Sequence, residues 1–172
     1  MNKINDRITL GIVAGLVGTI AKVLVDEISI KKKISQRSYR ETAAGVWVQS
    51  RKQARSFYGQ ILGTLMDLGL SSLGSVMMVN LLTKGGKDHL LVKGTFFGIS
   101  FGSTVTAILS GFQTNKVGPK DPQSNLSYVA SNAIYGIVTT LVAAKLGDDL
   151  LWDTPPTNNY LKPTMPTTEQ LN

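Results

Sequence analysis

The chain has 172 residues, of which 42% are hydrophobic and 17% are charged, and its formal net charge is +7. It has no cysteine and one histidine, His89, which excludes disulfides, zinc thiolate sites and cysteine nucleophiles. A histidine-based metal site or a Ser-His-Asp triad is not expected, and the composition calls for no cofactor. The whole positive excess lies within residues 31–55, where eight basic residues face Glu41 alone and the remaining charges cancel. Because this stretch separates two apolar runs, it indicates a loop that is retained in the cytoplasm and attracted to anionic lipid. We therefore expect no nucleic-acid partner.

The first predicted element is an apolar run over residues 8–28, followed by similar runs over residues 60–83, 90–112 and 127–146. A membrane-spanning helix needs about 20 predominantly apolar residues, so all four qualify. Lys3 and Arg7 before the first run are also typical of a cleaved signal peptide. That run is long, lacks a clear cleavage site and is followed by three more spans, so we predict an uncleaved helix. The sequence therefore predicts an all-α fold, a polytopic transmembrane four-helix bundle that occupies residues 1–152.

Small residues recur along one line of each predicted span. In lipid the hydrophobic effect does little to associate helices, and small residues four apart allow two backbones to approach closely. The spacing predicts glycine packing faces at Gly11, Gly15 and Gly18 of the first span, Gly59 and Gly63 of the second, and Gly94, Gly98 and Gly102 of the third. The fourth span is less regular, with Ala133, Gly136, Thr140 and Ala144.

Residues 31–59 form the one substantial loop, in which aromatic and small apolar residues alternate with cations. Two alternatives fit this composition: a segment lying in the headgroup region with its apolar side down, or a solvated basic loop with a short helix. Its basic residues predict contacts with anionic lipid headgroups, and they are Lys31, Lys32, Lys33, Arg37, Arg40, Arg51, Lys52 and Arg55.

The other connections are short, and the basic residues around them predict an orientation. Residues 85–89 form a tight turn, and residues 115–125 join the third and fourth spans through Pro119 and Pro122, with Ser124 or Asn125 as the N-cap. Loops 31–59 and 113–126 together carry ten lysines and arginines, against five on the opposite side. We therefore predict a multi-pass protein of the bacterial cytoplasmic membrane, with both loops cytoplasmic and both termini outside. Residues 153–172, rich in proline and threonine, predict a disordered tail.

One polar cluster is predicted inside the membrane. Lys22 follows Gly18 by four residues and Asp67 follows Gly63 by four, so each lies on the packing face of its helix at a similar depth. An intramembrane ion pair between them is expected, with Ser71 and Asn132 as neighbours that can join it by hydrogen bonds. The alternative is that Lys22 pairs with Asp26 and snorkels, which leaves Asp67 bonded to Ser71 as structural glue.

Several segments together resemble a family of small four-span integral membrane proteins from anaerobic and spore-forming Firmicutes bacteria. They are DRITLGIVAGLVGTIAK near the start, RETAAG in the first loop, GKDHLLVKG before the third span, and the stretch from residue 115 to residue 149, with KDH at 87–89, KDP at 120–122 and LGD at 146–148 as the most distinctive parts. The resemblance implies a polytopic helical protein of the bacterial cytoplasmic membrane, and it implies no activity. The family pattern has a histidine where this chain has Asn132, which weakens a metal or proton site there.

The function predicted from these features is that of a non-enzymatic integral membrane protein, structural or accessory, acting through helix packing and lipid or partner contacts. Its expected partners are the bilayer, anionic headgroups, and a second copy of the chain or another membrane protein. The alternative is a small dimeric transporter or channel that uses Asp67 and Lys22 as its coupling pair. An intramembrane enzyme is not expected, because the chain has no HExxH motif and no serine with a base on another span.

Overall fold

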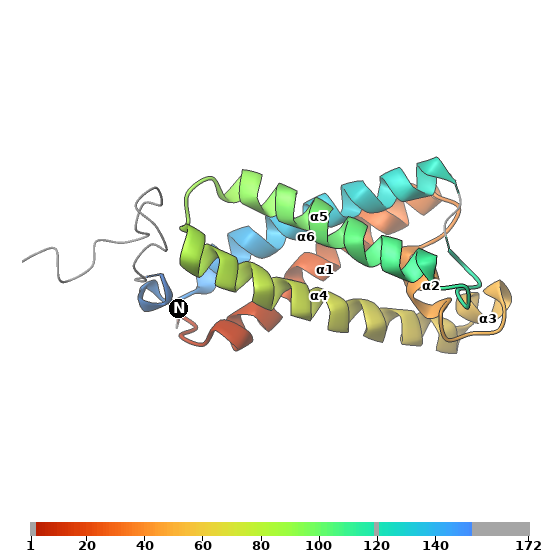
Figure 1. Ribbon diagram of the computed structural model, residues 1–172, viewed down its shortest axis with the longest axis horizontal. Helices are drawn as coiled ribbons and strands as arrows, with labels where there is room; N and C mark the ends of the chain where they lie inside the picture. Colours follow the sequence, from red (N-terminus) through yellow and green to blue (C-terminus); the bar gives the residue numbers. More distant parts are fainter. Residues whose placement is uncertain (1–2, 119–120, 153–172) are drawn as a thin grey trace, which may run out of the picture.

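The computed structural model of the protein describes residues 3–118 and 121–152 (Figure 1). Within these residues the helices are α1 (Arg7–Lys31), α2 (Tyr39–Ala44), α3 (Arg51–Arg55), α4 (Phe57–Gly85), α5 (Leu90–Gly111) and α6 (Pro122–Leu146), followed by the 3-10 turn η1 (Asp149–Leu151). Four of them, α1, α4, α5 and α6, are long and apolar enough to cross a membrane. The predicted all-α four-span bundle is confirmed, whereas the predicted disorder of residues 153–172 lies outside the described residues.

Three of the four long helices, α1, α4 and α6, begin at side-chain caps, and each of these three starts earlier than predicted. Asp6 accepts a hydrogen bond from the Thr9 N–H at 2.6 Å at the start of α1. α6 begins at Pro122, several residues before the predicted span, and Asp121 rather than Ser124 or Asn125 is its N-cap. Proline suits the first helical position because it has no N–H to leave unsatisfied there. Pro122, which indicated a loop in the sequence, is therefore the first residue of α6.

The four long helices pack in the spatial order α4, α1, α6, α5 (Figure 1). α1 runs between α4 and α6, and α5 lies along α6. α4 and α5 follow each other in the chain, yet large side chains keep their backbones apart. The rings of Phe97 and Phe101 stack 5.5 Å apart, and Phe101 lies against Gly74 of α4. Close backbone approach is thus confined to three of the four helix pairs around the bundle.

Glycines lie where those three pairs come together. On α1, Gly11 and Gly15 face α4 and Gly18 faces α6, so the glycines of this helix pack against two neighbouring helices. On α5, Gly94 and Gly98 lie against the α6 backbone at Gly136. An added Cβ at any of these positions would collide with a neighbouring helix, which is the close approach that small residues permit.

Gly59 and Gly63 of α4 differ from this pattern. Gly59 lies against the backbone of Ala54 in α3, and Gly63 lies against the Arg40 carbonyl of α2. Their small size accommodates the two short helices of residues 31–56, not another span.

The end of the bundle that carries the N-terminus also carries the α4–α5 turn and η1 (Figure 1). The N–H of Ile4 donates to the Leu146 carbonyl at 2.9 Å, and the Lys3 ammonium lies 2.6 Å from Asp149. Trp152 is fully buried in a core that includes Leu10 and Met78. These contacts hold the segment before α1 and the segment after α6 together at the same end of the bundle.

The opposite end is closed by α2 and α3 (Figure 1). Tyr39, Ala43 and Ala44 of α2 are buried within the protein, so this part of loop 31–59 is a short helix packed against the bundle. The apolar residues of α2 contact α4 and the rest of the bundle, and the position of loop 31–59 relative to the lipid headgroups stays a prediction. The aromatic residues that do face outward here are Trp47, Phe57 and Tyr58, with exposures of 64%, 74% and 81%. Such residues are typical of the membrane–water interface.

Candidate functional site

A buried ion pair joins α1 to α4 near the end of the bundle that α2 closes. The Lys22 ammonium contacts Asp67 Oδ1, and each residue is only 2% exposed. Ser71, one turn along α4, donates its hydroxyl to the same oxygen at 3.3 Å. This is the pairing that the equal depth and shared inward direction of the two residues predict. The second oxygen of Asp67, Oδ2, has no hydrogen-bond partner among the described residues.

Aromatic rings enclose the Lys22 ammonium. Its nitrogen lies 3.9 Å from the centroid of the Tyr39 ring and 6.0 Å from that of Tyr135. A cation over an aromatic face is attracted by the ring quadrupole, most strongly where water is excluded. Tyr135 is held in turn by its hydroxyl, which donates to the Ser71 carbonyl at 2.5 Å. Lys22 therefore points into the protein and does not snorkel to the interface.

Asp26 is a third charged group that the bundle buries, and it too is 2% exposed. Its Oδ2 accepts the N–H of Tyr39 at 2.8 Å, while its Oδ1 has no partner among the described residues. The alternative pairing of Lys22 with Asp26 is not formed in the described part of the chain. Sequence reasoning missed this role of Asp26, because its partner is a backbone group that the folding of residues 31–38 brings back to α1.

Asn132 and Ser75 lie outside the pair, contrary to the prediction for Asn132. The Asn132 amide donates to the Tyr128 carbonyl on its own helix at 2.8 Å, and its side chain packs against Gly102. It lines a lateral cavity of about 280 Å³ between α5 and α6, together with Ser103, Thr106 and Tyr128. Ser75 donates to the Ser72 carbonyl and packs on Gly15. Each of the five cavities identified in the described part of the chain is lined by residues other than Lys22, Asp26 and Asp67.

Tyr128 of α6 fixes the start of α2 from the side opposite Asp26. Its hydroxyl lies 3.0 Å from the Thr42 hydroxyl and bonds to the Arg37 and Ser38 carbonyls, each at 3.1 Å. The Tyr39 and Tyr128 rings meet edge to face with centroids 5.4 Å apart. Burial and the nearby Asp67 carboxylate raise the pKa of the Tyr39 phenol, so that ring stays neutral. α2 is thus anchored to both α1 and α6 and covers Lys22.

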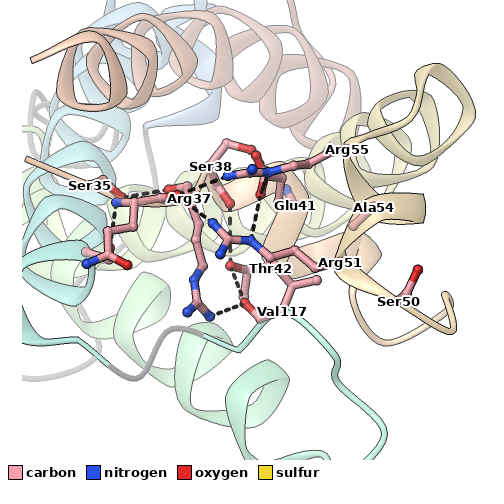
Figure 2. Close-up of polar contacts among 12 residues, drawn as sticks. Ser35, Arg37, Ser38, Glu41, Thr42, Ser50, Arg51, Ala54, Arg55 and Val117 are labelled. Carbon is pink, nitrogen blue, oxygen red and sulfur yellow. Dashed lines mark hydrogen bonds and ion pairs between the residues drawn. The ribbon is translucent and has the colours of Figure 1, made fainter. Parts of the chain in front are cut away.

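Four arginines of the basic loop are engaged within the protein, and Figure 2 shows Arg37, Arg51 and Arg55 among them. Arg37 donates to the carbonyls of Val117 and Gly118 at 3.3 and 2.5 Å, which ties the loop to the α5–α6 connection. Arg51 and Arg55 flank Glu41, with nitrogen to oxygen distances of 3.9 and 3.1 Å. Burial and then the neighbouring Arg55 lower the pKa of the Arg51 guanidinium. Arg40 pairs with Glu27 of α1.

The lysines of the same loop differ from its arginines. Lys31, Lys32, Lys33 and Lys52 are exposed, and none of them has an acidic partner among the described residues. The eight predicted headgroup residues therefore divide into four arginines that hold the loop and four lysines that face outward.

His89 lies at the opposite end, in the left-handed region at φ 50°, with its side chain 79% exposed. Within the described residues no group of three or more histidine, cysteine, aspartate or glutamate residues is placed to hold a metal ion.

Comparisons with family models, curated proteins and solved structures gave no match to this chain. The relation of the protein to the membrane follows from the helical bundle itself. The four spans identify a multi-pass membrane protein in contact with the lipid bilayer. Consistent with this, large apolar side chains face outward along every span, among them Ile20, Leu65, Phe96 and Leu126.

Proposed function

We propose that this protein is a non-enzymatic, accessory membrane protein that binds anionic lipid headgroups through the outward lysines at the α2 and α3 end. The observation that supports the proposal is the division within the basic loop between arginines held by protein groups and lysines facing outward. A basic surface at the end of a membrane bundle attracts anionic lipid by about 1 kcal/mol for each lysine near the membrane surface.

The two ends of the bundle differ in how their charges are balanced. At the N-terminal end, Lys3 and Lys87 lie 2.6 and 3.5 Å from Asp149, and Lys93 lies 2.6 Å from Asp88. Hydrogen bonding and the charge of Lys3 lower the pKa of Asp149, and those of Lys93 lower the pKa of Asp88, so both carboxylates are ionised at neutral pH. The α2 and α3 end has no comparable acidic balance for Lys31, Lys32, Lys33 and Lys52 among the described residues. The exposed cations Arg7, Lys84 and Lys145 of the N-terminal end come from three different helix ends, whereas Lys31, Lys32 and Lys33 are consecutive. Selectivity for anionic lipid is therefore expected to be stronger at the α2 and α3 end.

The test compares lipid retention by two triple variants. Removing the charges of Lys31, Lys32 and Lys33 by substitution with glutamine should weaken phosphatidylglycerol binding by about 3 kcal/mol, roughly a hundredfold. The matched control removes three exposed cations at the opposite end, in the variant Arg7→Gln/Lys84→Gln/Lys145→Gln. Native mass spectrometry of the full chain counts the phosphatidylglycerol and phosphatidylcholine molecules that it retains, and reports whether a second copy stays bound.

The expected result is a preference for phosphatidylglycerol that the first variant loses and the control variant keeps. Equal loss in both variants would mean that net charge alone attracts the lipid. Equal retention of phosphatidylglycerol and phosphatidylcholine by the unmodified chain would overturn the proposal.

The second candidate function is transport, and the observation that favours it is a buried ion pair inside a membrane bundle, since intramembrane charges commonly mark ion pathways. Against it, the Tyr39 and Tyr135 rings fill the space around Lys22, and the identified cavities lie elsewhere. The native chain has no cysteine, so a single Ser71→Cys variant isolates this question. A transport pathway predicts labelling of Cys at position 71 by a membrane-impermeant thiol reagent, and the accessory role predicts none, with Ser50→Cys as the positive control.

A further inference from the structure

We propose that the buried cluster of Lys22, Asp26 and Asp67 binds one proton, carried by Asp26 as a neutral carboxylic acid at neutral pH. This proton site is independent of the lipid contacts proposed above. It follows from a charge imbalance that only the folded chain reveals, because two carboxyl groups and a single ammonium lie together inside the bundle.

The burial of the cluster makes the imbalance important. Lys22, Asp26 and Asp67 are each 2% exposed, so water does not compensate a net charge. Asp26 Oδ1 and Asp67 Oδ2 both lack a hydrogen-bond partner among the described residues. Leaving a carboxylate ionised and unpaired in an apolar interior is far more costly than protonating it, so such a group neutralises. With one cation and two carboxyl groups, one carboxyl group must take up a proton.

The surroundings assign the proton to Asp26. Asp67 contacts the Lys22 ammonium directly and receives a second hydrogen bond from Ser71, and both contacts favour its charged form. Asp26 receives only the backbone N–H of Tyr39. The better compensated of the two carboxyl groups remains ionised.

The groups facing Asp26 from the neighbouring elements do not supply a second cation. From its own helix, Lys22 attracts a negative charge on Asp26 and Glu27 repels it, and Asp67 of α4 repels it as well. Glu27 is paired with Arg40 of α2, and Glu41 is flanked by Arg51 and Arg55. α6 contributes the phenols of Tyr128 and Tyr135, both of which are hydrogen-bonded to backbone carbonyls. The local balance is therefore one negative charge in excess until a proton binds.

A proton fits this site better than a metal cation. None of the five cavities identified in the described part of the chain is lined by Asp26 or Asp67, and a proton, unlike a larger ion, needs no cavity of its own. Asp26 also joins α1 to α2 through the N–H of Tyr39, whose ring covers Lys22. Release of the proton would leave the excess charge directly beneath α2, the helix that separates the cluster from the basic end.

The experiment counts protonated aspartates by infrared spectroscopy of the full chain reconstituted in phospholipid and labelled with ¹³C at the aspartate carboxyl. A protonated carboxyl group has a C=O stretch well separated from the carboxylate bands, and the isotope shift restricts the signal to aspartate. The unmodified protein should show one such carbonyl at pH 7, and Asp26→Asn should show none. Lys22→Met removes the cation, so two protons should bind and the band should double. Asp67→Asn balances Lys22 against Asp26 alone and should abolish the band. Exposed Asp88→Asn is the control and should leave it unchanged.

Each other outcome overturns the proposal in a distinct way. Absence of the band in the folded, unmodified protein at pH 7 removes the proton altogether, and a stabilisation by Na⁺ but not by choline would then identify a cation site. A band that persists in folded Asp26→Asn places the proton on Asp67. If Asp26→Asn does not fold, as judged by tryptophan fluorescence, the doubling in Lys22→Met and the loss of the native band with rising pH decide the question.

Discussion

The ring of Tyr39 lies with its centroid 3.9 Å from the Lys22 ammonium, although Lys22 belongs to the first span and Tyr39 to the loop that follows it. The backbone N–H of the same tyrosine donates to Asp26, one turn beyond Lys22 on α1. A six-residue helix thus covers the only described ion pair in which both side chains are almost completely buried. This relationship makes α2 part of the bundle.

Replacing Tyr39 tests whether its ring stabilises Lys22. Tyr39→Leu should lower the free energy of unfolding by about 2 kcal/mol or more, because the cation–π contact of a desolvated ammonium is lost along with packing. Tyr39→Phe keeps the ring and should lie close to the unmodified protein. Thermal unfolding in detergent, followed by tryptophan fluorescence, compares the two. Equal destabilisation by both variants would contradict a role for the ring face.

Lys22→Met breaks the ion pair and should destabilise the bundle by about 3 kcal/mol, because Asp67 loses its partner in a buried position. The double variant Lys22→Met/Asp67→Leu removes both charges and should recover most of that loss, since well-packed apolar residues commonly replace a buried pair without penalty. Chemical denaturation in mixed micelles measures the difference. A double variant as unstable as the single one would show that the loss of the pair itself, and not the carboxyl group left without a partner, destabilises the fold.

Two glycine substitutions of the same size should act in opposite directions. Gly98→Ala places a methyl group against the Asn132 backbone of α6, where α5 and α6 are in close contact, and should separate the helices. Gly69→Ala lies on α4 with nothing within 4 Å and should stabilise its helix by about 0.5–1 kcal/mol. Melting temperatures of the two variants in the same detergent decide this. Destabilisation of similar size in both would argue against the α5–α6 contact.

The two tryptophans should contribute very differently. Trp152 is fully buried beneath the N-terminal end, and Trp152→Ala should cost about 3–5 kcal/mol through loss of apolar burial and the cavity left behind. Trp47 is 64% exposed, so Trp47→Ala should change the stability of the detergent-solubilised protein little. The remaining tryptophan reports unfolding in each variant. Comparable losses would place Trp47 in a contact that its exposure does not reveal.

The orientation proposed for the bundle is testable because the native chain has no cysteine. Single variants Gln113→Cys and Asn5→Cys introduce thiols at exposed positions of the basic and N-terminal ends. With the basic end in the cytoplasm, as the lysine and arginine bias predicts, a membrane-impermeant maleimide added to intact cells should label Asn5→Cys alone. Labelling of Gln113→Cys alone would reverse the orientation.

The sequence by itself determined the number of spans, their approximate bounds and the facing of Lys22 toward Asp67. These features depend on local quantities: the length of an apolar run against the thickness of the bilayer, and the helical period that places residues four apart on one face. Because two helices joined by one loop run in opposite directions, the depths of Lys22 and Asp67 also follow from chain position alone.

Only the tertiary structure decided which faces meet. Asn132 has the depth for the Lys22 cluster, but α6 turns it toward Gly102 of α5, and Gly63 packs on α2 where a neighbouring span was expected. The sequence indicated Asp26 only as an alternative partner of Lys22, whereas in the structure it accepts the N–H of Tyr39 from the following loop. Hydropathy and helical period describe one helix at a time, whereas the rotation of each helix and the docking of α2 are set by long-range contacts among all of them.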